Sequence, residues 1–305
     1  MSLQKVKVGK VEWIHIEHPN DDDIGYLREN FKFHELHYED CISDEEYTRV
    51  DTFDGYHFII LQFAQWHLHG AELTNNEVDV FVSKNYIITV NHSNKQLEKM
   101  AADFFANKNL VKSYLKEGTG MLLYRIMKIS SDASFGVLYD LQHKLGELEL
   151  RVLDSKDSHD YLHQILLAKK NILHFRRIVT NQLDLIKELV ERFKNFEEGF
   201  SKTHLNDLRD SITRISSLVE LAHDTIVALE STNEALLTRN TNNVIKALTF
   251  FSVVMLPLTV ISGVYGMNLD TLPFAKSEHS FMIVIGVMVS VVLGMLAVFK
   301  WRKWL

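Results

Sequence analysis

The sequence predicts an α+β domain, with a mixed sheet flanked by helices, followed by long helices, a stalk helix and two C-terminal transmembrane helices. Three observations predict this fold class. Strand-like patterns are confined to residues 1–117. From Gly118 onward, apolar residues recur every three or four positions. Two long apolar runs then lie near the end of the chain.

The composition narrows the classes of function. The 305 residues carry a formal net charge of −7, which argues against a nucleic-acid partner. Cys41 is the only cysteine, so no intrachain disulfide is expected. The N-terminus lacks the apolar core of a signal peptide. There is no phosphate-binding glycine loop and no catalytic triad pattern, so we expect neither an enzyme nor an organic cofactor.

The first 117 residues read as strands and short helices. Residues 11–16 alternate like a strand, and the Asn/Asp-rich segment that follows resembles a helix start. Residues 56–68 and 76–92 are β-branched and aromatic, with a hairpin turn at 83–85. Residues 38–47 are predicted to form an acidic loop.

The next segments are predicted to be long helices. Residues 119–153 and 158–197 have helical periodicity, with a break at 154–160 and another at Gly199. An apolar seam then follows in alternating steps of three and four, typical of a helix that packs along its whole length. The residues of this seam are Leu205, Leu208, Ile212, Ile215, Val219, Ala222, Ile226 and Leu229. No proline interrupts the pattern before Pro257, so we expect this stalk helix to continue into the membrane.

Residues 244–267 and 281–299 are each long enough to cross a hydrocarbon core, which requires about 20 residues. The alternative is a pair of buried core helices, but both runs are apolar around the whole circumference. The tail "KWRKWL" has the basic and aromatic residues of a cytoplasmic interface. Both termini and the α+β domain are therefore expected to be cytoplasmic.

The predicted organisation has seven parts. They are a cytoplasmic α/β domain (1–117), a long-helix hairpin (118–200), the stalk helix (201–243), a first transmembrane helix (244–267), an extracytoplasmic loop (268–280), a second transmembrane helix (281–299) and a basic tail (300–305).

One face of the first span is unusually polar. The series Asn242, Ile245, Thr249, Ser252, Leu256, Thr259, Gly263 and Gly266 is small or polar at six of its eight positions. Two interpretations remain open, namely close helix–helix packing and the wall of a pore. A pore needs several copies around an axis, and the seam at 205–229 offers a reason for copies to assemble.

The residues at the end of this span resemble a known family. "YGMN" (265–268), preceded by "MLPLT" (255–259) and followed by a second span and a basic tail, is similar to the CorA family of divalent-cation transporters. The similarity covers the pore helix from Asn240 to Asn268, and the order of the domains also fits.

The resemblance implies a funnel-shaped homopentamer in the plasma membrane that admits Mg²⁺ passively, with Co²⁺ or Ni²⁺ as further ions. The residues that it implicates fall into four groups. They are a selectivity filter (Gly266, Met267, Asn268), polar pore residues (Asn242, Thr249, Ser252, Thr259), a hydrophobic gate (Ile245, Leu248, Leu256) and regulatory metal ligands (Asp207, Asp210). Mg²⁺ is thus implied both as the transported ion and as a cytoplasmic ion that favours closure. A helix terminus with unusual backbone angles would explain Gly266.

Other interpretations also remain. Asp207 and Asp210 are alternatively solvated acids. The loop from Leu269 departs from the acidic segment that is frequent in the family, which leaves the ion open among Mg²⁺, Co²⁺, Ni²⁺ and Zn²⁺. A zinc transporter of the same superfamily is one alternative, although Met267 argues against it. A membrane-anchored coiled-coil scaffold without a pore is the other.

Two further patterns favour ordinary structural roles. His67 and His69 are spaced to share one face of a strand, but no cysteine or clear third ligand accompanies them as zinc ligands. The acidic runs 21–23 and 44–46 are better explained as a helix start and a solvated loop than as ion sites.

Overall fold

The computed structural model describes residues 2–43, 47–67, 70–107, 113, 115–154, 161–192, 201–267, 273 and 279–302. The chain divides into two compact units, Met1–Glu230 and Ser231–Leu305. The first unit holds the sheet and most of the helices, and the second holds the two apolar helices.

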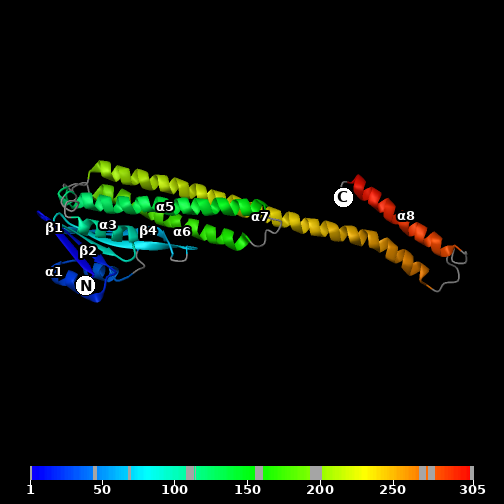
Figure 1. The fold of residues 1–305 in the computed structure, drawn as a ribbon, viewed down its shortest axis with the longest axis horizontal. Helices are drawn as coiled ribbons and strands as arrows, with labels where there is room; N and C mark the ends of the chain where they lie inside the picture. The colour runs from blue at the N-terminus through cyan, green and yellow to red at the C-terminus, as the bar shows by residue number, and fades with distance from the viewer. Residues whose placement is uncertain are drawn as a thin grey trace. The chain divides into compact units, whose positions relative to one another are not determined.

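A six-stranded mixed sheet forms the centre of the first unit, in the order β1-β2-β6-β5-β4-β3 (Figure 1). Neighbouring strands are antiparallel except β2 and β6, which are parallel. The strands are β1 (Leu3–Val8), β2 (Val11–Glu17), β3 (Arg49–Phe53), β4 (Tyr56–Trp66), β5 (Leu73–Val82) and β6 (Tyr86–Asn91). The β5–β6 pair confirms the hairpin predicted around residues 83–85.

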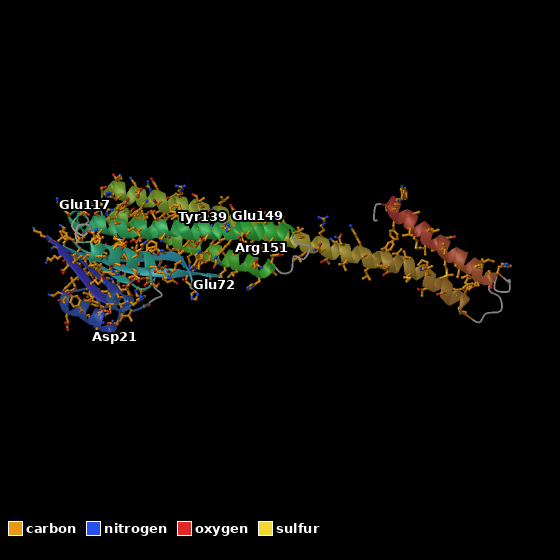
Figure 2. All side chains as sticks on the ribbon, in the orientation of Figure 1. Asp21, Glu72, Glu117, Tyr139, Glu149 and Arg151 are labelled. Atoms are coloured by element: carbon orange, nitrogen blue, oxygen red, sulfur yellow. The ribbon has the colours of Figure 1, made fainter. Side chains whose placement is uncertain are left out.

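One face of the sheet packs against α1 (Asp21–Asn30) and α2 (Glu35–Asp40). The Asn20 side chain accepts a hydrogen bond from the Asp23 backbone and the Asp23 side chain accepts one from the Asn20 backbone, which closes a capping box. Asp21 stands at the start of α1 (Figure 2). The acidic run 21–23 is therefore a helix start, as predicted.

The opposite face packs against α3 (Lys95–Ala106) and two long helices, α5 (Thr119–Asp154) and α6 (Leu162–Arg192). Trp13 is fully buried there, with the ring of Phe104 4.7 Å away and that of Phe105 5.1 Å away. α6 is joined to the hairpin of β4 and β5 by Asn171, whose side chain accepts from the Leu73 backbone at 3.0 Å. The helices predicted at 119–153 and 158–197 are confirmed in their described parts.

Four elements were not predicted. Three of them, β1, β3 and α2, have a weak sequence signal, whereas α3 has a clear one in its Asn94 cap and in the helical spacing of its buried residues Leu97, Ala101 and Phe104. β1 and β3 are edge strands with polar or charged residues, a common feature of sheet edges. α2 has only six residues, too few to show a period. It occupies residues that were predicted as part of a loop at 38–47, so that prediction was wrong for residues 38–40. α3 begins at Lys95 after the cap Asn94.

Several predicted features fall outside the described residues. They are residues 155–160 and Gly199 of the two helix breaks, the acidic run 44–46 and His69. β4 ends at Trp66, so His67 lies beyond the strand. The predicted shared strand face for His67 and His69 is therefore wrong for His67.

The stalk helix α7 runs from Lys202 to Tyr265 as one helix of 64 residues that includes Pro257. All eight residues of the predicted seam are buried, at 5% exposure or less. This burial arises within a single chain, where α7 packs against α5 and α6. The contacts that flank the seam include Lys128 Nζ to Ser211 Oγ (2.8 Å), Arg176 Nε to Glu220 Oε1 (2.6 Å) and Lys169 Nζ to Glu230 Oε2 (2.6 Å).

The seam therefore gives no reason for copies to assemble, contrary to the expectation from its heptad pattern. Sequence periodicity shows that a helix buries one face, but it does not say whether the partner belongs to the same chain.

The buried seam generates a prediction about stability. Ile215→Ala should lower the free energy of unfolding by about 2–4 kcal/mol, because Ile215 is fully buried and a cavity would remain. Leu221→Ala is the matched control on the same helix, since Leu221 is 59% exposed. Denaturant unfolding of the detergent-solubilised protein measures both. A loss at Ile215 no larger than that at Leu221 would contradict the intrachain packing.

Candidate functional site

The second unit contains the two helices of the chain's described part that are long and apolar enough to cross a membrane. They are the C-terminal part of α7 and α8 (Ser280–Trp301). None of the residues in their apolar windows is buried within the protein, so these side chains need a lipid or protein environment outside the chain. α8 ends near the basic residues Lys300 and Arg302.

The face of α7 predicted to be polar points away from α8. The half-buried residues Phe250, Val254 and Ile261 recur at helical spacing, and the Phe250 ring lies 5.3 Å from that of Phe299 on α8. At about 100° per residue, these three lie on the opposite side of the helix from Ser252 and Thr259, which are exposed. α8 thus covers one side of α7 and leaves the polar face uncovered.

The hydroxyl groups on this face are bonded to their own helix. Thr249, Ser252 and Thr259 each donate to the carbonyl oxygen four residues earlier, at 2.7, 2.9 and 2.9 Å. A hydroxyl has one donor and two acceptor lone pairs. Because the donor is used within the helix, what each hydroxyl offers to a partner is an acceptor oxygen.

Apolar side chains interrupt the polar face. Ile245, Leu248 and Leu256 are 54%, 66% and 67% exposed, although all three are large and apolar. Asn242 is also exposed. Polar oxygens and branched apolar groups therefore alternate along one uncovered side of the helix.

The outer end of this helix differs in one respect from the prediction. Gly266 does not have a positive φ, so unusual backbone angles do not explain it. Its backbone still donates to the Ser262 carbonyl at 2.8 Å, and a Cβ at Gly266 would lie 3.0 Å from that oxygen. A side chain at this position would therefore crowd the preceding turn of its own helix. Met267 is 55% exposed, and Asn268 lies outside the described residues.

The last turn of α7 contains no basic residue. The C-terminus of a helix carries a partial negative charge of roughly half a unit from its unpaired carbonyl groups. That charge is therefore not neutralised by a lysine or arginine of the same turn, and it favours cations at this end.

The two predicted regulatory acids lie in the first unit and have different environments. The Asp207 carboxylate accepts a hydrogen bond from the Tyr124 hydroxyl at 2.8 Å and lies 3.1 Å from Lys128 Nζ. The hydrogen bond from Tyr124 has the largest effect on Asp207 and, together with the charge of Lys128, holds the pKa of this carboxyl below its ordinary value. Asp210 is 75% exposed and lies 3.7 Å from Arg209.

Asp210 is therefore largely exposed, whereas Asp207 is paired within its own chain. Its two partners, Tyr124 and Lys128, are four residues apart on α5 and so share one helix face. A sequence pattern on α5 reveals that shared face, but it does not show which residue of α7 the face meets.

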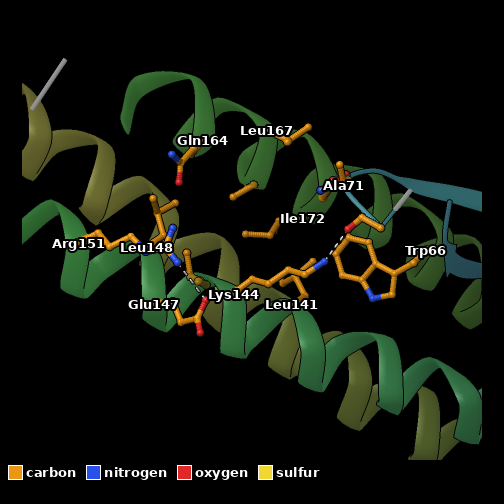
Figure 3. Close-up of a pocket in the computed structure, with 14 residues that line it drawn as sticks. Trp66, Ala71, Leu141, Lys144, Glu147, Leu148, Arg151, Gln164, Leu167 and Ile172 are labelled. Atoms are coloured by element: carbon orange, nitrogen blue, oxygen red, sulfur yellow. Dashed lines mark hydrogen bonds and ion pairs between the residues drawn. The ribbon is translucent and has the colours of Figure 1, made fainter. Parts of the chain in front are cut away.

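A separate cavity of about 270 Å³ in the first unit is lined by residues of α5, α6 and the segment after β4 (Figure 3). Its rim cations already have partners. Lys144 Nζ donates to the Gly70 carbonyl at 2.7 Å and lies 3.5 Å from the centre of the Trp66 ring. Arg151 lies 3.5 Å from Glu147. We assign no ion or ligand to this cavity.

Comparisons with known proteins agree with this arrangement. YfjQ of Bacillus subtilis is 28% identical over 313 residues, covering 99% of this chain and 94% of that protein. The cobalt/magnesium transport protein CorA of Thermotoga maritima is 25% identical over 297 residues, covering 96% and 83%. The complete structure of the CorA magnesium transporter from Methanocaldococcus jannaschii matches with a TM-score of 0.84 at 19% identity, covering 99% of this chain and 95% of that one.

The match to the Methanocaldococcus jannaschii structure shows that this chain shares its fold, with a sheet domain, long helices and two apolar C-terminal helices. The model of the family described as CorA-like Mg²⁺ transporter protein matches residues 8–302, nearly the whole chain. The chain therefore belongs to the CorA family of divalent-cation transporters.

Proposed function

We propose that this protein is a homopentameric channel in the plasma membrane that admits Mg²⁺ passively, with α7 lining the pore. The observation that carries this proposal is the uncovered face of α7, where acceptor oxygens alternate with apolar side chains. The names of the relatives from Thermotoga maritima and Campylobacter jejuni support magnesium as the ion, and the first of these also names cobalt. Co²⁺ and Ni²⁺ are the further ions that we propose.

The chemistry of this face suits a hydrated ion. Mg²⁺ loses its water shell reluctantly, and the outer hydrogens of that shell are donors. Thr249, Ser252 and Thr259 offer acceptors, because their own hydrogens are used within α7. Neutral oxygens attract such an ion without holding it as tightly as a ring of carboxylates would. Asn242 adds a further neutral oxygen.

Gly266, Met267 and Asn268 form the selectivity filter in this proposal. The partial negative charge at the end of α7 would concentrate cations at this mouth. Ile245, Leu248 and Leu256 form the gate. When these apolar groups are close together, water leaves the constriction and a hydrated ion cannot cross.

Both termini are cytoplasmic in this proposal, which the basic residues near the end of α8 support. The first unit is then the part that senses cytoplasmic Mg²⁺, through Asp207 and Asp210. An ion bound more tightly in the closed state shifts the population toward closure. Because Lys128 lies 3.1 Å from Asp207, an incoming cation competes with that ammonium group.

Transport by the purified protein tests the proposed pathway. Proteoliposomes that contain a Mg²⁺-sensitive dye should show uptake under an inward Mg²⁺ gradient. Thr259→Val should lower the rate at least about fivefold, because each subunit would lose an acceptor and a single such hydrogen bond is worth about 1 kcal/mol. Asn268→Ala should lower it as well.

Ser290→Ala is the matched control, since the Ser290 hydroxyl donates in the same way to the carbonyl four residues earlier, that of Gly286 on α8. It should keep the wild-type rate. Absence of Mg²⁺ uptake, or equal rates for Thr259→Val and Ser290→Ala, would contradict the proposal. Uptake of Zn²⁺ in preference to Mg²⁺ would favour the zinc transporter, and no ion uptake at all would favour the scaffold.

The regulatory proposal has a separate test. Lys128→Met should lower the Mg²⁺ concentration that half-closes the channel by up to about fivefold, because a partly exposed ion pair is worth about 0.2–1 kcal/mol. Lys144→Met removes a charge from the same helix away from Asp207 and should have no such effect. Equal half-closing concentrations for the two variants would show that Asp207 has only a structural role.

A further inference from the structure

Three side chains of the first unit converge at the β5–β6 pair. Glu77 and Asp79 lie on β5, and His92 directly follows β6. One oxygen or nitrogen of each residue lies within 4.8 Å of the corresponding atoms of the other two. His92 Nε2 is 3.0 Å from Asp79 Oδ2.

The strand pattern explains why the two acids are buried. Residues 77, 79 and 81 share one face of β5, and Phe81 on that face belongs to the core formed with α1 and α2. Glu77 is 3% exposed and Asp79 is fully buried. Two carboxylates are thus directed into an apolar interior, where an isolated charge is very unfavourable.

One acceptor of Asp79 lacks a well-formed hydrogen bond. Its Oδ1 atom is buried and has no partner of ordinary hydrogen-bond geometry in the described part of the chain, although the buried Cys41 thiol is close enough to interact with the carboxylate. A buried polar atom of this kind requires an explanation, and an ion or a water molecule is the usual one.

We propose that Glu77, Asp79 and His92 bind one divalent transition-metal ion such as Zn²⁺ or Co²⁺. Ligand distances of about 2.0–2.2 Å place neighbouring donor atoms about 3–4 Å apart, which small rotations of these side chains would satisfy. The charge of a divalent ion balances two carboxylates beside a neutral imidazole. Imidazole nitrogen favours zinc, cobalt or nickel, whereas Mg²⁺ prefers sites made only of oxygen.

This site is independent of the proposed ion pathway. Its donors include a nitrogen, it is buried in the sheet domain, and it links β5 to the residue after β6. A metal bound here would stabilise the folded state of the first unit, because the donors come together only on folding.

Binding of Co²⁺ alone to the full chain in detergent tests this proposal, because Co²⁺ held by nitrogen and oxygen ligands absorbs visible light. The wild-type protein should show a saturable absorption band that Zn²⁺ removes and excess Mg²⁺ does not. His92→Gln keeps a hydrogen-bonding amide but removes the nitrogen ligand, and it should weaken Co²⁺ binding at least about tenfold. His143→Gln, an exposed histidine of α5, is the matched control and should bind as wild type does.

Thermal unfolding gives a second readout. Zn²⁺ should raise the melting temperature of the wild type and of His143→Gln, but not that of His92→Gln or Asp79→Asn. The proposal is overturned if the wild type shows no saturable band, or if the band persists in His92→Gln. Because neither measurement involves transport, failure here leaves the proposed channel untouched, and failure of transport leaves this site intact.

Discussion

The rest of the structure depends on one constraint, which is that α7 must satisfy its backbone hydrogen bonds within itself. Lipid offers no partner to an unpaired N–H or C=O group, so a membrane-crossing segment that does not belong to a closed barrel is helical. α7 meets this demand as a single helix from Lys202 to Tyr265, except at Pro257, which has no N–H to donate. The hydroxyls of Thr249, Ser252 and Thr259 also bond to that helix. The same constraint therefore leaves oxygen acceptors, rather than hydroxyl donors, on the uncovered face.

The sequence predicted those helices and strands in which the buried residues recur at a regular spacing. The seam of α7 and the β5–β6 hairpin were found because their apolar residues alternate regularly, and all eight residues of the seam are buried. The edge strands β1 and β3 were missed because they are partly exposed to solvent, which weakens the alternation of apolar and polar residues along each strand. α2 was missed because six residues are too few to define a helical face.

The candidate sites show the same limit. The polar face of α7 is local to one helix, so spacing alone identified it, and α8 covers the other side. The contact of Asp207 with Tyr124 spans 83 positions of sequence and could not be read from either segment. The convergence of Asp79 and His92 depends on strand register, because Asp79 lies on β5 and His92 directly follows β6, its partner in the hairpin.

Water access along α7 tests the central claim most directly. Single cysteines can be placed at two exposed positions of the polar face (Ser252→Cys, Thr259→Cys) and at two half-buried positions on the side facing α8 (Val254→Cys, Ile261→Cys), with Cys41→Ser as the background. If the polar face lines a hydrated pore, a water-soluble thiol reagent should modify positions 252 and 259 in the membrane-embedded protein and leave 254 and 261 unmodified. Resistance of all four positions would contradict the account, because it would mean that the polar face is a dry contact between helices.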